Sequence, residues 1–472
     1  MNLQVQISRP TPVSIDLSGA NSFLTGAVYD SGASSGDNTG TSLDMNGGAV
    51  WNVTDDSTVT NVSASGATIR TNGKELEVDN LVNTDAGTTF ETSSGRESQI
   101  SIAQYTGDFS VAITEEGMTE INADNVAQSM ASVIDATAAQ DTNGTITMRG
   151  AETSLLGETE LTLDSNGNIV SYSEGTSSVS EGLQDIAAMN YLFFRSTMND
   201  VSKRMGDLRT MPRSAGMWAR YYGGKMEYGD MNMDTQYNTL QIGADRWYNN
   251  FYYGISASIS DGNGDLDNGS VDNRNYNLGI YGGWLADNGQ YIDFILKRHR
   301  LQTEGALSTS SGTRNSFDYY NWATSLSLEY GWRFNCPNTG FWVEPQAEFM
   351  YGQFEKTSFS TSQDVKVEQD TIKSMIGRLG VSLGYTFAEN RGSAYFKASV
   401  LHDWKGETNV TLAAQGSDRS YEDDLGGTWG EFALGGTYNI TDRFSAYGDI
   451  LTTTGSPVRS PWEVSVGVRW TF

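Results

Sequence analysis

Histidine and cysteine are common catalytic bases and nucleophiles, and this chain of 472 residues has only two histidines and one cysteine. Both histidines, His299 and His402, lie in the C-terminal part. Residues 1–178 contain neither residue type, so a Ser-His-Asp or Cys-His nucleophilic site cannot be assembled there. A single cysteine also excludes a disulfide framework and every metal site built from several cysteines.

Carboxylates are the other side chains with possible chemistry, and the chain has 58 Asp and Glu against 30 Lys and Arg. Two of them could act as a glycosidase pair, although an acidic surface is more often simply solvated. There is no Asp-x-Asp-x-Asp-Gly loop, and we expect no metal site and no cofactor. The formal net charge of -28 argues against nucleic acid as a partner, because phosphates require a basic surface.

The composition divides the chain near residues 175–180. Residues 1–178 hold seven of the 52 aromatic residues and carry 5 basic and 24 acidic side chains, a net charge of -19. The remainder holds 45 aromatic residues, with 25 basic and 34 acidic side chains. No apolar run approaches the 18 residues of a spanning helix. The first residues, MNLQVQISRP, lack the pattern of a signal peptide, so either the protein is not exported or a signal peptide precedes this sequence.

Residues 13–115 alternate in short stretches that Gly, Asn, Asp or Ser separates every 8–12 residues, which indicates an all-β fold. Strands this short, rich in Val and Thr and poor in aromatic residues, favour a parallel β-solenoid over a sandwich. The alternative is a disordered polar tail. Residues 123–140 predict one amphipathic helix.

From Ala215 onward the alternating strands become long. In the last strand one face is apolar from Trp462 to Phe472, and the residues between are polar or small. Period two over about ten residues with aromatic ends is typical of a transmembrane barrel, whereas sandwich strands are usually five or six residues long.

Twelve strands with alternately short and long connections are predicted, an even count that suits an outer-membrane barrel. With Phe472 on the side of the short turns, all six longer loops fall outside the cell. The expected strands are near 216–228, 236–248, 251–262, 272–286, 290–303, 317–334, 340–355, 371–387, 393–405, 424–438, 443–453 and 461–472, and the longest predicted loops are 304–316, 356–370 and 406–423.

A helical pattern runs from Val179 to Arg209, and Pro212 ends it. The lumen of a twelve-stranded barrel is wide enough for about one helix, which suggests a chain threaded through its own pore. The alternative is a linker helix on the periplasmic side.

The motifs at this junction resemble those of autotransporters, the type Va secretion family. The resemblance covers roughly residues 195–472, whereas residues 13–115 are similar to a pertactin-like passenger end only by pattern. The residues that carry it are Asn199 to Arg209 (NDVSKRMGDLR) with Met217-Trp218-Ala219-Arg220, then Tyr291-Ile292-Asp293, Val343 to Glu348 (VEPQAE) with Tyr351-Gly352, and Ile376 to Gly380 (IGRLG). The end Arg469-Trp470-Thr471-Phe472 is similar to the signal read by the barrel-assembly machinery, which makes Trp470 and Phe472 the expected assembly signal.

The resemblance implies an all-β protein with a right-handed parallel β-helix fragment at 1–115, a junction at 116–178, a pore helix at 179–211 and a twelve-stranded transmembrane barrel at 212–472. It implies a Gram-negative outer-membrane protein that displays its own passenger at the cell surface. Without passenger His and Cys, we expect an adhesin, not a protease or other enzyme. Expected partners are outer-membrane lipid and lipopolysaccharide, the barrel-assembly machinery, periplasmic chaperones and a host-surface ligand. The alternative is a porin-like channel with a periplasmic acidic domain.

Some relatives cut themselves inside the pore, where an Asn amide nitrogen attacks its own backbone carbonyl and forms a succinimide. The resemblance maps this reaction onto Asn199 and Asp200, and the assisting acids onto Asp293, Glu348 and, less securely, Glu329. The strand alternation independently points all three acids into the lumen. In the alternative, these acids pair with Arg333, Arg378 and helix residues Lys203 or Arg204, and only hold the plug.

Overall fold

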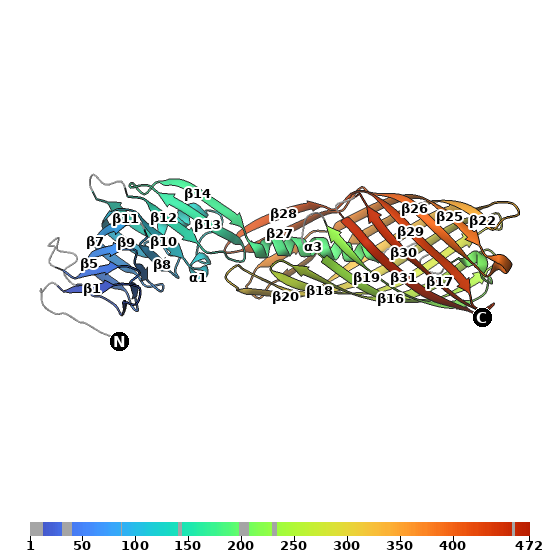
Figure 1. Ribbon diagram of the computed structural model, residues 1–472, viewed down its shortest axis with the longest axis horizontal. Helices are drawn as coiled ribbons and strands as arrows, with labels where there is room; N and C mark the ends of the chain where they lie inside the picture. Colours follow the sequence, from blue (N-terminus) through green and yellow to red (C-terminus); the bar gives the residue numbers. More distant parts are fainter. Residues whose placement is uncertain are drawn as a thin grey trace. The chain divides into compact units, whose positions relative to one another are not determined.

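The computed structural model describes residues 13–30, 40–85, 87–139, 144–197, 207–228, 234–455 and 458–472. These residues are mostly in strands and divide into two compact units (Figure 1). The first comprises Met1–Glu181 with the hairpin tips Ser308–Thr313 and Ala413–Asp418, and the second comprises the rest. Among the helices that the structure describes, none is both long and apolar enough to cross a membrane.

Two sheets of mainly parallel strands build the first unit, and its first twelve strands alternate between them, whereas the last two continue the second sheet as antiparallel strands. This is the parallel β-solenoid that the short alternating stretches predicted. One sheet contains β1 (Ser14–Ser18), β3 (Ser42–Asn46), β5 (Ser57–Ser65), β7 (Leu76–Asp85), β9 (Ile100–Thr106) and β11 (Ile134–Ala138). The other contains β2 (Phe23–Thr25), β4 (Val50–Asn52), β6 (Thr68–Arg70), β8 (Thr89–Thr92), β10 (Phe109–Ile113), β12 (Ile146–Gly150), β13 (Leu156–Leu163) and β14 (Ile169–Thr176).

A column of equivalent side chains forms the core of each solenoid sheet. In the first sheet, the strand register aligns Leu43, Val62, Leu81 and Tyr105, all of which are buried. In the second sheet, the aligned and buried residues are Trp51, Ile69, Phe90, Val111 and Met148. Each rung therefore buries its apolar side chains mainly against the neighbouring rungs.

The prediction of one helix over residues 123–140 is wrong in its second half. Helix α2 covers only Val126–Ser132, after a short α1 at Glu115–Met118, and the chain then enters β11. Strand β11 pairs in parallel with β9, and β12 pairs in parallel with β10, so the solenoid continues beyond residue 115. Pairing with the open edge of β9 outweighs the local helical pattern, because tertiary contacts override propensity.

Twelve long antiparallel strands form the second unit, and their closed order is that of a barrel (Figure 1). The first strand pairs with the last, and β20 pairs with β22, which closes the sheet. The strands are β15 (Gly216–Tyr228), β16 (Asp234–Tyr248), β17 (Phe251–Leu266), β18 (Gly269–Leu285), β19 (Gln290–Ser308), β20 (Arg314–Trp332), β22 (Phe341–Phe354), β25 (Ile372–Thr386), β26 (Gly392–Asp403), β29 (Gly427–Asn439), β30 (Phe444–Thr454) and β31 (Val458–Thr471), and the short β21 (Phe334–Asn335) follows β20.

The burial pattern alternates along these strands, as the period-two reading predicted. On β31, Trp462, Val464, Val466 and Val468 face outward, while the residues between them are buried. Apolar side chains that face outward and polar side chains that face inward are typical of a transmembrane barrel.

Two of the predicted long loops contain strands instead. Within 356–370 lie β23 (Thr357–Ser360) and β24 (Lys366–Gln369), and within 406–423 lie β27 (Glu407–Ala414) and most of β28 (Ser417–Asp424). These four strands form a separate sheet in which Val367, Val410 and Leu412 are buried, as is Val365 directly before β24. Because most of their residues are polar, the apolar alternation that marks a strand was weak.

The helix before the barrel is shorter than predicted. Helix α3 covers Ser178–Ser196, and residues 207–211 contain only a 3₁₀ turn, η1 (Leu208–Thr210). Helix α3 begins where Glu152 accepts hydrogen bonds from the backbone N (2.6 Å) and Oγ (2.5 Å) of Ser178. Burial opposes ionisation of Glu152, but hydrogen bonds from Ser178 and Ser310 hold the pKa of this carboxyl below its usual range.

The solenoid core makes a direct stability prediction at Trp51, which is 0% exposed and donates Nε1–H to the Gly26 carbonyl at 3.0 Å. We expect Trp51→Ala to destabilise the first unit by about 3–5 kcal/mol, because a large cavity is left in the column. Pulse proteolysis of the full chain across a urea series measures this. The control Tyr172→Ala removes an aromatic ring that is 40% exposed, and an equal loss in both variants would argue against the buried column.

Candidate functional site

Many charged side chains are buried in the interior of the barrel. Because side chains alternate along each strand, every second residue faces the lumen, where polar groups are expected. These charged residues are each less than 10% exposed, and they include Arg220, Asp245, Asp293, Lys297, Glu329, Arg333, Glu344, Glu348, Arg378, Asp403 and Arg469. Buried ions of this kind are tolerated only when they are paired and hydrogen-bonded.

Two of the three predicted acids share one arginine. Glu329, Glu348 and Arg378 occupy directly opposite positions on the neighbouring strands β20, β22 and β25. The Arg378 guanidinium lies 2.6 Å from Glu348 and 3.4 Å from Glu329. Glu348 also accepts from Ser327 Oγ at 2.6 Å, and Glu329 accepts from the Tyr291 hydroxyl. The interaction with Arg378 is the structural alternative that the sequence left open.

Asp293 lies on β19 and has a different partner. The Tyr252 hydroxyl donates to its carboxylate at 2.6 Å. Tyr252 packs in an aromatic cluster at the interior surface with Trp218, Trp247, Tyr281 and Tyr291. Asp293 is therefore held by a tyrosine within an aromatic environment, and Glu329 and Glu348 are held by a cation.

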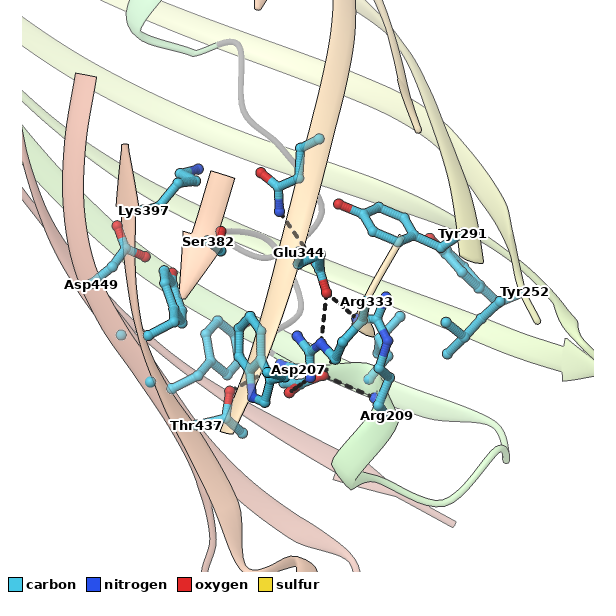
Figure 2. Close-up of a pocket in the computed structure, with 18 residues that line it drawn as sticks. Asp207, Arg209, Tyr252, Tyr291, Arg333, Glu344, Ser382, Lys397, Thr437 and Asp449 are labelled. Carbon is cyan, nitrogen blue, oxygen red and sulfur yellow. Dashed lines mark hydrogen bonds and ion pairs between the residues drawn. The ribbon is translucent and has the colours of Figure 1, made fainter. Parts of the chain in front are cut away.

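Arg333 joins the barrel wall to the chain segment that follows the helix (Figure 2). Its guanidinium contacts Asp207 at 2.7 Å and Glu344 at 2.6 Å, and it stacks over the ring of Trp342 at 3.6 Å. Arg209 adds a second contact to Glu344 at 3.3 Å. The pocket around these groups has a free volume of ≈ 40 Å³, which leaves space for only a few water molecules.

Asp207 is held from several strands at once. Besides Arg333, its carboxylate accepts from Ser393 Oγ at 2.9 Å, and its backbone N–H donates to Thr437 Oγ1 at 2.9 Å. Figure 2 shows Asp207, Arg333 and Glu344 converging in the lumen. We call Asp207, Arg209, Arg333 and Glu344 the lower charge cluster. It fixes the chain between helix and barrel to the wall.

The helix itself is anchored inside the barrel by polar contacts. Asn190 donates to the Tyr319 hydroxyl at 2.6 Å, and Tyr191 donates to Asp403 at 2.6 Å. Near the end of the helix, Lys297 Nζ donates to the Thr197 carbonyl at 2.7 Å. Since Asn190 and Tyr191 are almost completely buried, α3 occupies the lumen. The sequence therefore predicted the pore helix correctly, and the linker alternative is wrong.

The residues of the predicted cleavage site, Asn199 and Asp200, and the helix cations Lys203 and Arg204 lie outside the described residues. The last described turn of α3 is nevertheless informative. Ser196 and Glu348 line one cavity of ≈ 100 Å³, together with Arg378. Of the three predicted acids, Glu348 is the one that lines this cavity.

Sequence reasoning missed Asp207, Glu344 and Lys297. Glu344 precedes Glu348 by four residues on the same strand, so the alternation that points Glu348 inward does the same for Glu344. Lys297 likewise follows Asp293 by four residues on β19. Asp207 gave no such signal, because the register between a luminal segment and a barrel wall is not encoded in any local pattern.

Within the described parts of the chain, no group of three or more His, Cys, Asp or Glu side chains could hold a metal ion. The predicted assembly residues lie on the outward face. Trp470 is 56% exposed, Phe472 is 60% exposed, and their ring centroids are 5.9 Å apart.

Comparison with known proteins identifies the barrel. Residues 217–450 match the family model described as the autotransporter beta-domain. The barrel is an autotransporter β-domain. The related autotransporter barrels indicate that this barrel lies in the outer membrane. The predicted resemblance to autotransporters is confirmed.

The curated relatives that match this autotransporter β-domain belong to much longer proteins. The probable autotransporter YcgV of Escherichia coli is 28% identical over 242 residues, which are 48% of this chain and 24% of that protein. The serine protease EspC of Escherichia coli is 30% identical over 246 residues, which are 50% of this chain and 18% of that protein. The solved beta domain of the Bordetella autotransporter BrkA is 23% identical, covers 55% of this chain and 100% of its own, and has a TM-score of 0.46. The chain thus spans about a quarter or less of these two curated relatives.

The lower charge cluster predicts a measurable stability effect. We expect Arg333→Gln to lower barrel stability by about 3–5 kcal/mol, because Asp207 and Glu344 would keep buried charges without this partner. The measurement is the sample temperature at which the protein changes from compact to unfolded migration on a denaturing gel.

Arg391→Gln is the matched control, since the Arg391 side chain is 62% exposed and its pair with Glu389 is solvated. We expect a change below about 1 kcal/mol there. Equal conversion temperatures for the wild-type protein and the Arg333 variant would contradict a stabilising role of the cluster.

Proposed function

We propose that the barrel exports the N-terminal unit and displays it at the cell surface as an adhesive, non-enzymatic passenger. The observation that carries the proposal is the course of the chain. A solenoid unit is followed by α3, and α3 occupies the lumen of the barrel through the contacts of Asn190, Tyr191 and Lys297. A chain that runs through the lumen connects the two sides of the membrane.

The absence of histidine and cysteine from residues 1–178 supports a binding role over a protease role. EspC has a related barrel and is a serine protease, so a barrel of this family is compatible with either kind of passenger. The distinction therefore depends on the passenger, and residues 1–178 contain no histidine that could serve a Ser-His-Asp site. Under this proposal, a stacked β-solenoid presents a long surface to a ligand on a host cell.

Under this proposal, the transport of the chain to the outer membrane involves further partners. We propose that periplasmic chaperones and the barrel-assembly machinery handle the unfolded barrel, and that the machinery reads Trp470 and Phe472.

Surface cleavage of intact cells tests display. We expect external proteinase K to remove residues 1–178 from intact cells and to leave the barrel with α3, because the lumen shields the helix. Antibodies against each part, applied to blots of treated cells, follow both products. A periplasmic marker protein serves as the control for envelope integrity.

Protection of the N-terminal unit in intact cells, with cleavage only after lysis, would contradict display. That outcome would favour the alternative function, an outer-membrane channel with a periplasmic acidic domain.

A second candidate function is a single self-cleavage between Asn199 and Asp200. The Asn199 amide nitrogen would bond to its own backbone carbonyl carbon, and the peptide bond to Asp200 would break. The leaving nitrogen takes up a proton and becomes a new N-terminus, and the succinimide left behind is opened later by water. The location of Glu348 supports this candidate, because Glu348 lines the same cavity as Ser196, three residues before Asn199.

We expect Asn199→Gln to abolish this cleavage, because the longer side chain must close a less favourable six-membered ring. Glu348→Gln should slow it more than Asp293→Asn or Glu329→Gln, since Glu348 lines the cavity beside the helix end. N-terminal sequencing of the barrel from outer membranes measures the product, and heat-dependent migration confirms insertion of each variant. A full-length chain in mature membranes, with no N-terminus at Asp200, would show that the passenger stays attached.

A further inference from the structure

The outward face of β19 changes character part-way along the strand. Its first outward residues are apolar, with Ile292 40% exposed, Phe294 36% exposed and Leu296 37% exposed. The next two outward positions are Arg298 and Arg300. A pair of arginines directly follows a lipid-facing apolar stripe on the same face of one strand.

The height of the two arginines matches a membrane boundary. Strand β19 begins at Gln290, next to a short turn. Ten residues of strand at about 3.4 Å each, tilted by about 40°, climb roughly 25 Å along the barrel axis. Since the apolar band of such barrels is about 25 Å tall, Arg300 lies at the boundary opposite the short turns, and Arg298 lies about 5 Å below it.

Each guanidinium lies over an aromatic ring of the neighbouring strand β20. Arg298 is 5.0 Å from the centroid of the Trp322 ring, and Arg300 is 4.2 Å from that of Tyr320. Rings of this kind hold the long side chains in place and leave the guanidinium edges available for hydrogen bonds.

The charge balance differs between the two arginines. Arg298 NH1 contacts the Glu355 carboxylate at 2.5 Å and donates to Thr324 Oγ1 at 2.8 Å. Within the described part of the chain, Arg300 forms no ion pair. The two arginines therefore carry a net positive charge near the level of the lipid headgroups. An anionic group bound there would balance this charge.

A groove on the outward face leads to Arg298. It has a volume of ≈ 890 Å³, and its lining is almost entirely apolar apart from Arg298. Strand register aligns one row of its residues across six strands, namely Val468, Ala219, Ile242, Ala257, Leu278 and Arg298. The two alanines in this row leave space between larger side chains. Because the strands are tilted, the row climbs obliquely from the short-turn side toward the arginines.

We propose that Arg298 and Arg300 bind a phosphate group of lipopolysaccharide, the phosphorylated glycolipid of the outer leaflet, and that one acyl chain of the same lipid lies in the groove. Planar guanidinium groups bind phosphate oxygens bidentately, and an apolar groove of small residues accepts an acyl chain. The proposal rests on the outer-membrane location of the barrel and not on the role of the passenger. Surface cleavage of intact cells is therefore an independent test.

The test uses the full chain in dodecyl maltoside after removal of bound lipid, and native mass spectrometry with added bis-phosphorylated lipid A. We expect the double variant Arg298→Gln/Arg300→Gln to weaken lipid binding at least about tenfold. The control Arg391→Gln/Arg443→Gln removes the same charge from exposed positions at the short turns and should bind like the wild-type protein. Compact migration of the unboiled protein shows that each variant is folded.

The groove has its own pair of variants. Ala257→Trp fills the groove and should weaken binding of lipid A, while Ala347→Trp places the same ring at an outward position elsewhere and should not. Lipid A without its phosphates should bind the wild-type protein as weakly as the intact lipid binds the double arginine variant.

Several results would overturn the proposal. These are unchanged binding by the double arginine variant, equal binding of lipid A without phosphates, and equal binding of phosphatidylglycerol. Competition by millimolar inorganic phosphate would show a site for the free ion instead of a lipid. Equal effects of the Ala257 and Ala347 variants would remove the groove from the site.

Discussion

Closure of the barrel by backbone hydrogen bonds is the constraint on which the rest of this structure depends. Within the hydrocarbon layer no water can satisfy a free N–H or C=O group, so a sheet must have no open edge. The pairs β15–β31 and β20–β22 remove the edges here. Closure then produces two faces from one alternation, an apolar face toward lipid and a polar face toward the lumen. The arrangement of charge in this chain follows from that division.

Charges on the inner face must find partners there, and the helix and the segment after it supply part of them. Arg333 is shared between Asp207 of that segment and Glu344 of the wall, whereas Arg378 is shared between two wall acids, Glu329 and Glu348. The two arrangements have different consequences. The first fixes the chain in the pore. The second holds Glu348 in the wall of the cavity that Ser196, at the end of α3, also lines.

The sequence predicted the features that depend on local periodicity. The barrel strands and the inward direction of Glu329 and Glu348 follow from period two alone, and so does the outward direction of Trp462. The sequence did not predict the features that depend on contacts between residues distant along the chain. Residues 134–138 extend along the open edge of β9 although their surroundings look helical, and Val367 and Val410 lie in a small sheet in which most residues are polar. The contact between Asp207 and Arg333 joins residues 126 apart, so no spacing rule could reveal it.

On strand β19, the alternation of inward and outward side chains gives two neighbouring cations different environments. Lys297 and Arg298 are adjacent cations, yet Lys297 is 2% exposed and binds the Thr197 carbonyl, while Arg298 faces outward over Trp322. The inner cation compensates the carbonyl end of the pore helix, where the helix dipole is negative. The outer cation lies where the apolar stripe of outward residues on β19 ends. A shift of one residue in register would exchange these environments and bury Arg298 beside the helix while placing Lys297 in lipid. One register therefore determines both the hold on the helix and the charge presented to the membrane.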